Sequence, residues 1–222
     1  VTQEFTENLK GIFNESYTNY DKLYANFYAS GYNPTTNIVQ LDGYVDTTQR
    51  KSLNLSGNLV GEFEPGSIGH TIVAGLEYID TSNINDRFNP VFSTSGGDRE
   101  FFVPTRPLNL SGQAGVNAAG VAFTVPFSDP NDDTEADVEV FSAYIQDEIA
   151  ISEKLDIVVG ARFDSFDIEA VDVLTGTARA RKDDEISPRA GIVFKPQESV
   201  SIYGSFSRSF LPRSGEQFAS LS

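Results

Sequence analysis

The chain has 222 residues, a formal net charge of −16 and no cysteine. So acidic a chain repels polyanions, which excludes DNA or RNA as a natural partner, and the lack of cysteine excludes disulfides and thiolate metal sites within this sequence. Its 17 Phe, 9 Tyr, 18 Gly and 10 Pro favour strands and turns over helices, so the composition predicts an all-β fold.

Near the start of the chain, residues 20–28 carry apolar and aromatic side chains at a spacing of three and four. The residues are Tyr20, Leu23, Tyr24, Phe27 and Tyr28. This spacing is helical, but Asp21 and Asn26 are poor helix formers, and an Asn33-Pro34 turn follows. We expect a long strand here, with a short helix as the alternative.

Three hairpins follow, each marked by apolar and polar residues that alternate along two strands. Their tight turns lie at 64–67, 152–154 and 196–199. Leu53, Leu55 and Leu59 share one side of the first strand, opposite polar neighbours, and Asp147 interrupts the apolar side of the second hairpin. Each strand therefore has one face suited to hydrocarbon and one suited to water.

Long polar segments, from Asp86 to Asp137 and from Asp172 to Asp184, join the hairpins and are expected to be loops. Short turns that alternate with long loops are typical of outer-membrane barrels, whose strands need only about 9–11 residues to cross the bilayer. A lipid-facing sheet cannot leave an edge open. The pattern thus predicts an all-β, antiparallel transmembrane β-barrel segment of about seven strands, with partner strands outside residues 1–222.

Several segments resemble known sequences. AYIQDEIAISEKLDIVVGARFDSFD, which begins at Ala143, resembles the strand-turn-strand signature of TonB-dependent outer-membrane siderophore receptors. EISPRAGIVFKPQESVSIYGSFSRSF, YDKLYANFYA and the stretch from Arg50 to Glu77 look like the same family. LPRSGEQFASL, from Leu211, is similar to the monomeric-catecholate receptors in particular.

This resemblance implies a transport receptor and not an enzyme. The family's barrel has 22 strands and encloses a globular plug, and it imports ferric-siderophore across the outer membrane of Gram-negative bacteria with energy relayed by TonB. We therefore expect residues 1–222 to belong to the barrel domain, with the plug and the closing C-terminal strands absent from them. The expected partners are ferric-siderophore, TonB through the plug, and outer-membrane lipid and lipopolysaccharide. No cofactor is expected, because iron is carried as ferric-siderophore.

The segment from 86 to 137 combines cationic and aromatic side chains that suit an aromatic trianion such as ferric tris-catecholate. The candidate ligand-binding residues are Arg87, Phe88, Phe92, Arg99, Phe101, Phe102 and Arg106. The alternative is that these side chains pack the loop on itself or form an interfacial aromatic girdle.

Three further interpretations are weighed against this one. A passive porin-like channel shares the barrel pattern. A soluble β-rich, calcium-dependent binding module is suggested by the acidic run from Ser128 to Asp137, although that run lacks EF-hand spacing and favours a solvated loop. Lone His70 is expected to be structural, and no nucleophile, base and acid with plausible spacing suggest an enzyme.

Overall fold

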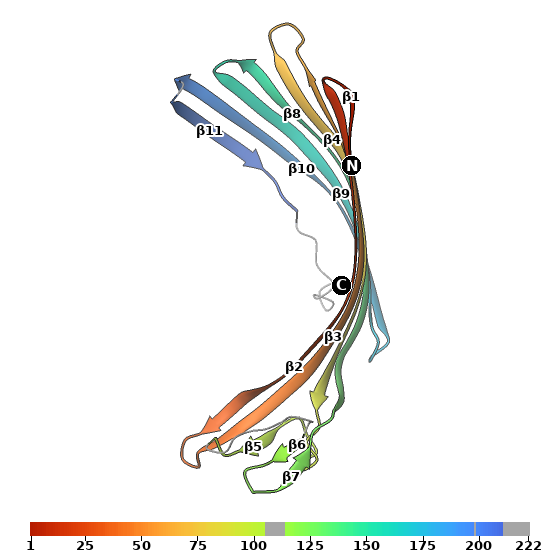
Figure 1. The fold of residues 1–222 in the computed structure, drawn as a ribbon, viewed down its shortest axis with the longest axis vertical. Helices are drawn as coiled ribbons and strands as arrows, with labels where there is room; N and C mark the ends of the chain where they lie inside the picture. The colour runs from red at the N-terminus through yellow and green to blue at the C-terminus, as the bar shows by residue number, and fades with distance from the viewer. Residues whose placement is uncertain (105–113, 198, 211–222) are drawn as a thin grey trace.

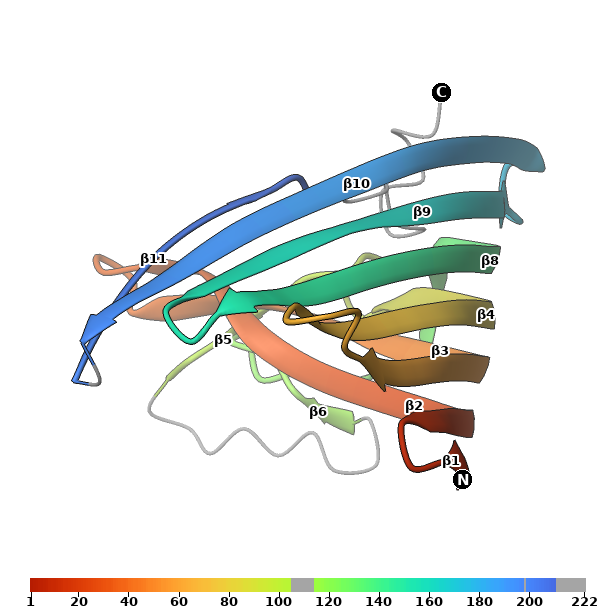
Figure 2. The same cartoon turned by 90° about the horizontal axis from the view of Figure 1, so that it is seen from above.

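A single curved antiparallel sheet dominates a computed structural model that describes residues 1–104, 114–197 and 199–210. Neighbouring strands follow the order β1, β2, β3, β4, β8, β9, β10, β11 (Figures 1 and 2). The main strands are β2 (Leu9–Asn33), β3 (Ile38–Phe63), β4 (Gly69–Pro90), β8 (Phe127–Ser152), β9 (Leu155–Asp172), β10 (Thr177–Gln197) and β11 (Val200–Ser207). They match the expected seven, and β1 (Thr2–Thr6) pairs with β2.

The three predicted hairpins are confirmed. β3 joins β4 at residues 64–68, β8 joins β9 at 153–154, and β10 joins β11 next to 198. Gly66 takes a positive φ of 79° in the first of these turns, a backbone conformation that side chains with a Cβ rarely adopt. The strand alternative for residues 20–28 is also confirmed, because all of them lie within β2.

One face of the sheet, here called the apolar face, carries large side chains that no described segment covers. A row across five strands pairs Gly57, Leu76, Ala143, Phe163 and Ile186 in register. Leu76 is 56% exposed and Ile186 is 59% exposed. Because the row has no second layer against it, these side chains face the surroundings and not a core.

The height of this band matches a bilayer. Apolar-face positions on β8 run from Phe141 to Ile151, which corresponds to about 33 Å at roughly 3.3 Å per residue. A strand tilt of about 40° reduces this to about 25 Å, the height of the apolar band on outer-membrane barrels. The next row along the strands is acidic and pairs Asp80, Glu139 and Asp167, so the band ends there.

Two predicted loops are wrong in extent. The expected loop from Asp172 to Asp184 is a turn of residues 173–176. Of the segment from Asp86 to Asp137, only residues 91–126 lie outside the two long strands β4 and β8. The acidic run from Ser128 to Asp137 lies in β8. Beyond the bilayer both faces of a strand meet water, so the apolar alternation disappears although the backbone pairing continues.

The calcium interpretation of this run is not supported by the geometry. Neighbouring side chains such as those of Asp132 and Asp133 point to opposite faces of β8, so they cannot converge on one ion. Among the residues that the structure describes, no group of three or more His, Asp or Glu side chains is placed to hold a metal ion. No helix in the described part of the chain is long and apolar enough to cross a membrane.

The segment between β4 and β8 forms a small excursion at one end of the sheet (Figure 1). It contains β5 (Glu100–Phe102), which pairs with β3, and the hairpin of β6 (Ala114–Val116) and β7 (Ala122–Thr124). Its core consists of Leu41, Phe92, Phe102, Phe123 and Val125, packed against Phe27 and Val39. The excursion thus covers apolar-face side chains of β2 and β3 that lie beyond the band.

The opposite face, here called the polar face, is held by cross-strand polar contacts. Arg162 on β9 pairs with Asp164 at 2.7 Å and reaches Glu77 on β4 at 2.6 Å. Ser142, between them on β8, donates to Asp164 at 2.6 Å. These contacts link β4, β8 and β9 on the polar face.

His70 is structural, as expected. Its Nδ1 atom lies 2.8 Å from Asp147, the residue that interrupts the apolar side of β8, and its ring stacks on Phe63 with 5.0 Å between centroids. The pair leaves neither polar group alone on the apolar face.

Candidate ligand-binding site

Three tyrosines and two arginines gather on the polar face, at the end of the sheet that carries the excursion. Tyr24 and Tyr28 come from β2, Tyr44 from β3 and Arg87 from β4, and Arg99 lies next to β5. We call these five residues the tyrosine–arginine patch. Tyr24 lies opposite Asp46 and Tyr28 opposite Asp42 in the β2–β3 register, which places them on one face.

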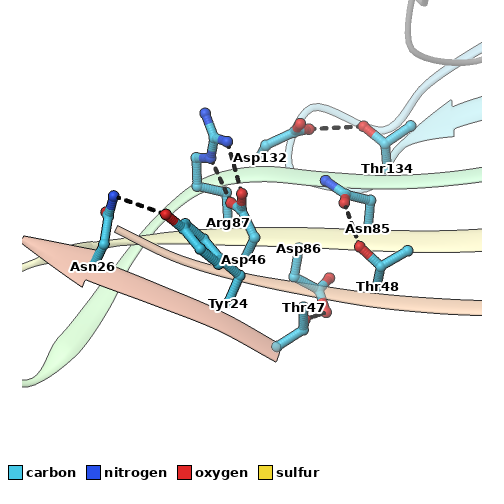
Figure 3. Close-up of polar contacts among 10 residues, drawn as sticks. All are labelled: Tyr24, Asn26, Asp46, Thr47, Thr48, Asn85, Asp86, Arg87, Asp132 and Thr134. Atoms are coloured by element: carbon cyan, nitrogen blue, oxygen red, sulfur yellow. Dashed lines mark hydrogen bonds and ion pairs between the residues drawn. The ribbon is translucent and has the colours of Figure 1, made fainter. Parts of the chain in front are cut away.

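Arg87 makes more polar contacts than the other arginine of the patch. It donates from Nε to Asp46 at 2.6 Å and from Nη2 to the second carboxylate oxygen at 2.8 Å (Figure 3). Its guanidinium carbon lies 4.5 Å from the centre of the Tyr44 ring, a cation–π distance. The hydrogen bond to Asp46 raises the pKa of Arg87 above its ordinary value, so this group stays charged at every physiological pH.

Arg99 forms the second ion pair of the patch. Its Nε lies 3.2 Å from Asp42, and its side chain is 53% exposed. The pKa of Tyr28 is raised, chiefly by desolvation and then by the negative charge of nearby Asp42, so its hydroxyl keeps its proton and remains a hydrogen-bond donor.

The rings of the patch lie close to one another. The Tyr24 and Tyr44 centroids lie 5.8 Å apart with a tilt of 41°, and those of Tyr28 and Tyr44 lie 6.2 Å apart, edge to face. Tyr24 is 45% exposed and Tyr28 is 43% exposed. The patch therefore offers exposed ring faces, phenol hydroxyls and guanidinium edges to a ligand on the polar side.

The candidate residues from the sequence separate into two groups. Arg87 and Arg99 belong to the patch, and Phe101 is 50% exposed near it. Phe92 and Phe102 are 0% and 1% exposed within the core of the excursion, so they pack the segment on itself and present no ring face.

The other two candidates do not join the patch. Phe88 pairs with Val45 and is half-buried. Arg106 lies outside the residues that the structure describes.

Sequence reasoning missed the three tyrosines of the patch. The spacing of Tyr20, Tyr24 and Tyr28 was interpreted only as a choice between helix and strand. Residues four apart also share one face of a strand, so the same spacing contained the signal for an aromatic stripe. Tyr44 gave no separate signal, because only the β2–β3 register brings it beside them.

The antiparallel sheet agrees with the family comparison. Residues 2–221 match the family model of the TonB dependent receptor-like β-barrel. The chain belongs to this family. Its members are outer-membrane transport receptors of Gram-negative bacteria and not enzymes. The family resemblance, the outer-membrane location and the non-enzymatic assignment predicted from the sequence are therefore confirmed.

Curated relatives of this TonB-dependent receptor chain include siderophore receptors. It is 30% identical over 164 residues to the probable TonB-dependent siderophore receptor PiuA of Acinetobacter baumannii, covering 69% of this chain. It is 29% identical over 186 residues to the ferrichrome outer membrane transporter/phage receptor of Escherichia coli K12, covering 77% of this chain. In both comparisons the match spans 21% of the relative's length.

Solved structures share the fold of this wall segment. The siderophore receptor PiuA from Acinetobacter baumannii aligns over 93% of this chain and 30% of its own, with a TM-score of 0.66 and 24% identity. The open form of the ferric-catecholate import receptor Fiu from E. coli K12 aligns over 95% of this chain and 34% of its own, with a TM-score of 0.68 and 17% identity. At these identities the likeness concerns the fold alone.

Proposed function

We propose that this chain forms part of the wall of a receptor that imports ferric-siderophore, and that the tyrosine–arginine patch contacts the ligand. The observation that carries the proposal is the grouping of three tyrosines and two arginines on the polar face beside the largest excursion. Ligand pockets combine aromatic surface with a few placed polar groups, and this patch has both. Its family membership and its siderophore-receptor relatives support the cargo.

Further strands and a plug are part of this proposal. The described sheet has two open edges, at β1–β2 and at β11, and an unpaired edge within lipid leaves several backbone groups unsatisfied. Closure by additional strands removes both edges. A plug domain in the enclosed space would then provide the contact with TonB, while outer-membrane lipid and lipopolysaccharide would surround the apolar face.

Ferric catecholate is the narrower proposal for the ligand class. Tyrosine rings stack well on catechol rings, and guanidinium groups offset the charge of a tris-catecholate trianion. Of the residues selected from the sequence, Arg87, Arg99 and Phe101 remain candidates for contact. The segment with the specific likeness to catecholate receptors, from Leu211, lies outside the described residues.

The test is ligand binding by the complete receptor that contains these residues. We expect a Tyr24→Ala/Tyr44→Ala double variant and an Arg87→Ala variant each to weaken binding of ferric tris-catecholate about ten-fold or more, measured by fluorescence quenching. Tyr17→Ala is the matched control, because Tyr17 lies on β2, is 64% exposed and occupies the apolar face opposite Leu53. Unchanged affinity in the patch variants would remove the patch from the site.

A second ligand distinguishes the proposed import function from the narrower proposal of a catecholate ligand. If the receptor binds a neutral ferric trihydroxamate through the patch and does not bind ferric tris-catecholate, the catecholate class is rejected. The import function would stand in that case.

A further inference from the structure

Carboxylates already occupy part of each guanidinium group of the patch, so an anion meets arginines whose charge is partly offset. Asp46 takes both the Nε and the Nη2 donors of Arg87, which leaves only the outer edge of the guanidinium. Asp46 is the less exposed partner, at 19% against 41% for Arg87. The resulting bidentate pair has the geometry of the stronger guanidinium–carboxylate contacts.

The patch also carries more negative than positive charge. Asp42 holds Arg99, and Asp132 on β8 lies opposite Arg87 in the sheet register. The carboxylates around the two guanidinium groups are those of Asp42, Asp46, Asp98 and Asp132, and they outnumber the cations by one even when Lys22, on the same face of β2, is counted with Arg87 and Arg99. Such a patch binds a ligand of charge −3 less tightly than its guanidinium groups alone would, whereas a neutral complex of the same size meets only its rings and hydroxyls.

We infer that Asp46 is a specificity-determining residue that sets the preference of the patch between anionic and neutral ferric complexes. The inference rests on the proposed function and adds the charge of the ligand to it. To bind a trianion closely, the patch has to exchange the Asp46 carboxylate for ligand oxygens at Arg87. A neutral complex binds the tyrosines without that exchange, so Asp46 lowers affinity for the trianion selectively.

Asp46→Asn in the complete receptor tests this directly. We expect the variant to bind ferric tris-catecholate about three- to ten-fold more tightly than the wild type, because one charge is removed within about a Debye length of a −3 ligand. Affinity for a neutral ferric trihydroxamate is expected to change less than two-fold. Raising the salt concentration from about 0.05 M to about 0.5 M is expected to reduce the gain in affinity of Asp46→Asn for ferric tris-catecholate.

Two matched variants isolate the charge at position 46. Asp46→Glu keeps the charge and is expected to give none of the gain in affinity for ferric tris-catecholate that Asp46→Asn gives. Asp80→Asn removes the same charge from the exposed apolar face of β4 and is expected to leave both affinities unchanged, which excludes an effect of net charge alone.

Several results would overturn the inference. A weaker affinity of Asp46→Asn for both ligands would mean that Asp46 only positions Arg87 over Tyr44. Equal changes in affinity for the two ligands would also reject it. So would the same affinity of the wild type and of Asp46→Asn for ferric tris-catecholate, or no binding of that trianion by either protein. The proposed function fails separately, if Arg87→Ala and Tyr44→Ala leave binding of both ligands at the wild-type level.

Discussion

An arginine placed in the apolar band tests what that band faces. Ile145 is 55% exposed on β8, between Ala74 and Ala161, and lies near the middle of the band. In water an exposed substitution of this kind changes the free energy of unfolding by about 0.5 kcal/mol. At the midplane of a bilayer, an arginine on the lipid face of a barrel costs about 2–4 kcal/mol.

Leu23→Arg is the control for this change. Leu23 is 71% exposed on the same face of β2, opposite Thr47 and beyond the acidic row that ends the band. We expect Ile145→Arg to lower the unfolding free energy of the vesicle-reconstituted receptor by about 2–4 kcal/mol, and Leu23→Arg by less than about 1 kcal/mol. Denaturant titration measures both, and equal losses would refute the assignment of the band to lipid.

Three further outcomes concern packing and charge. Phe92→Ala empties the core of the excursion and is expected to cost about 3–5 kcal/mol locally, seen as faster proteolysis within 91–126, while unchanged cleavage would contradict that core. A Cβ at Gly75 would lie 2.6 Å from Asn58 Oδ1 and against the Tyr144 ring, so Gly75→Val is expected to lower the melting temperature, and a neutral effect would contradict this close approach. Desolvation and then the Asp86 carboxylate raise the pKa of Asp133, so the protonated form stabilises the fold, and this contribution is lost as pH rises through the raised pKa. Asp133→Asn is therefore expected to raise the melting temperature at pH 7 but not at about pH 3, and an equal gain at both would contradict the shift.

The hairpins were predictable because lipid imposes a strict pattern. Where one face meets hydrocarbon, nearly every second side chain is apolar, so the runs Leu53 to Leu59 and Phe141 to Ile151 identify strand and face together, with Asp147 as the exception. Outside the band that constraint ends. The segments 128–137 and 177–184 are paired strands, yet their composition resembles that of loops.

The site was predictable only in part. Arg87 and Arg99 were selected for their charge among aromatics, and both lie in the patch. Phe92 and Phe102 were selected by the same rule, but hydrophobic burial places them in the core of the excursion. Composition does not distinguish a ring that packs from one that binds, and Tyr44 joins the patch through strand pairing alone.

The central claim is that the apolar face contacts lipid and the polar face lines the enclosed space. Since residues 1–222 contain no cysteine, single cysteines along β8 allow spin labels at chosen faces. Labels at 141, 143 and 145 are expected to be accessible to dissolved oxygen in reconstituted membranes, and labels at 142, 144 and 146 are not. The absence of this alternation, or the reverse pattern, would contradict the account.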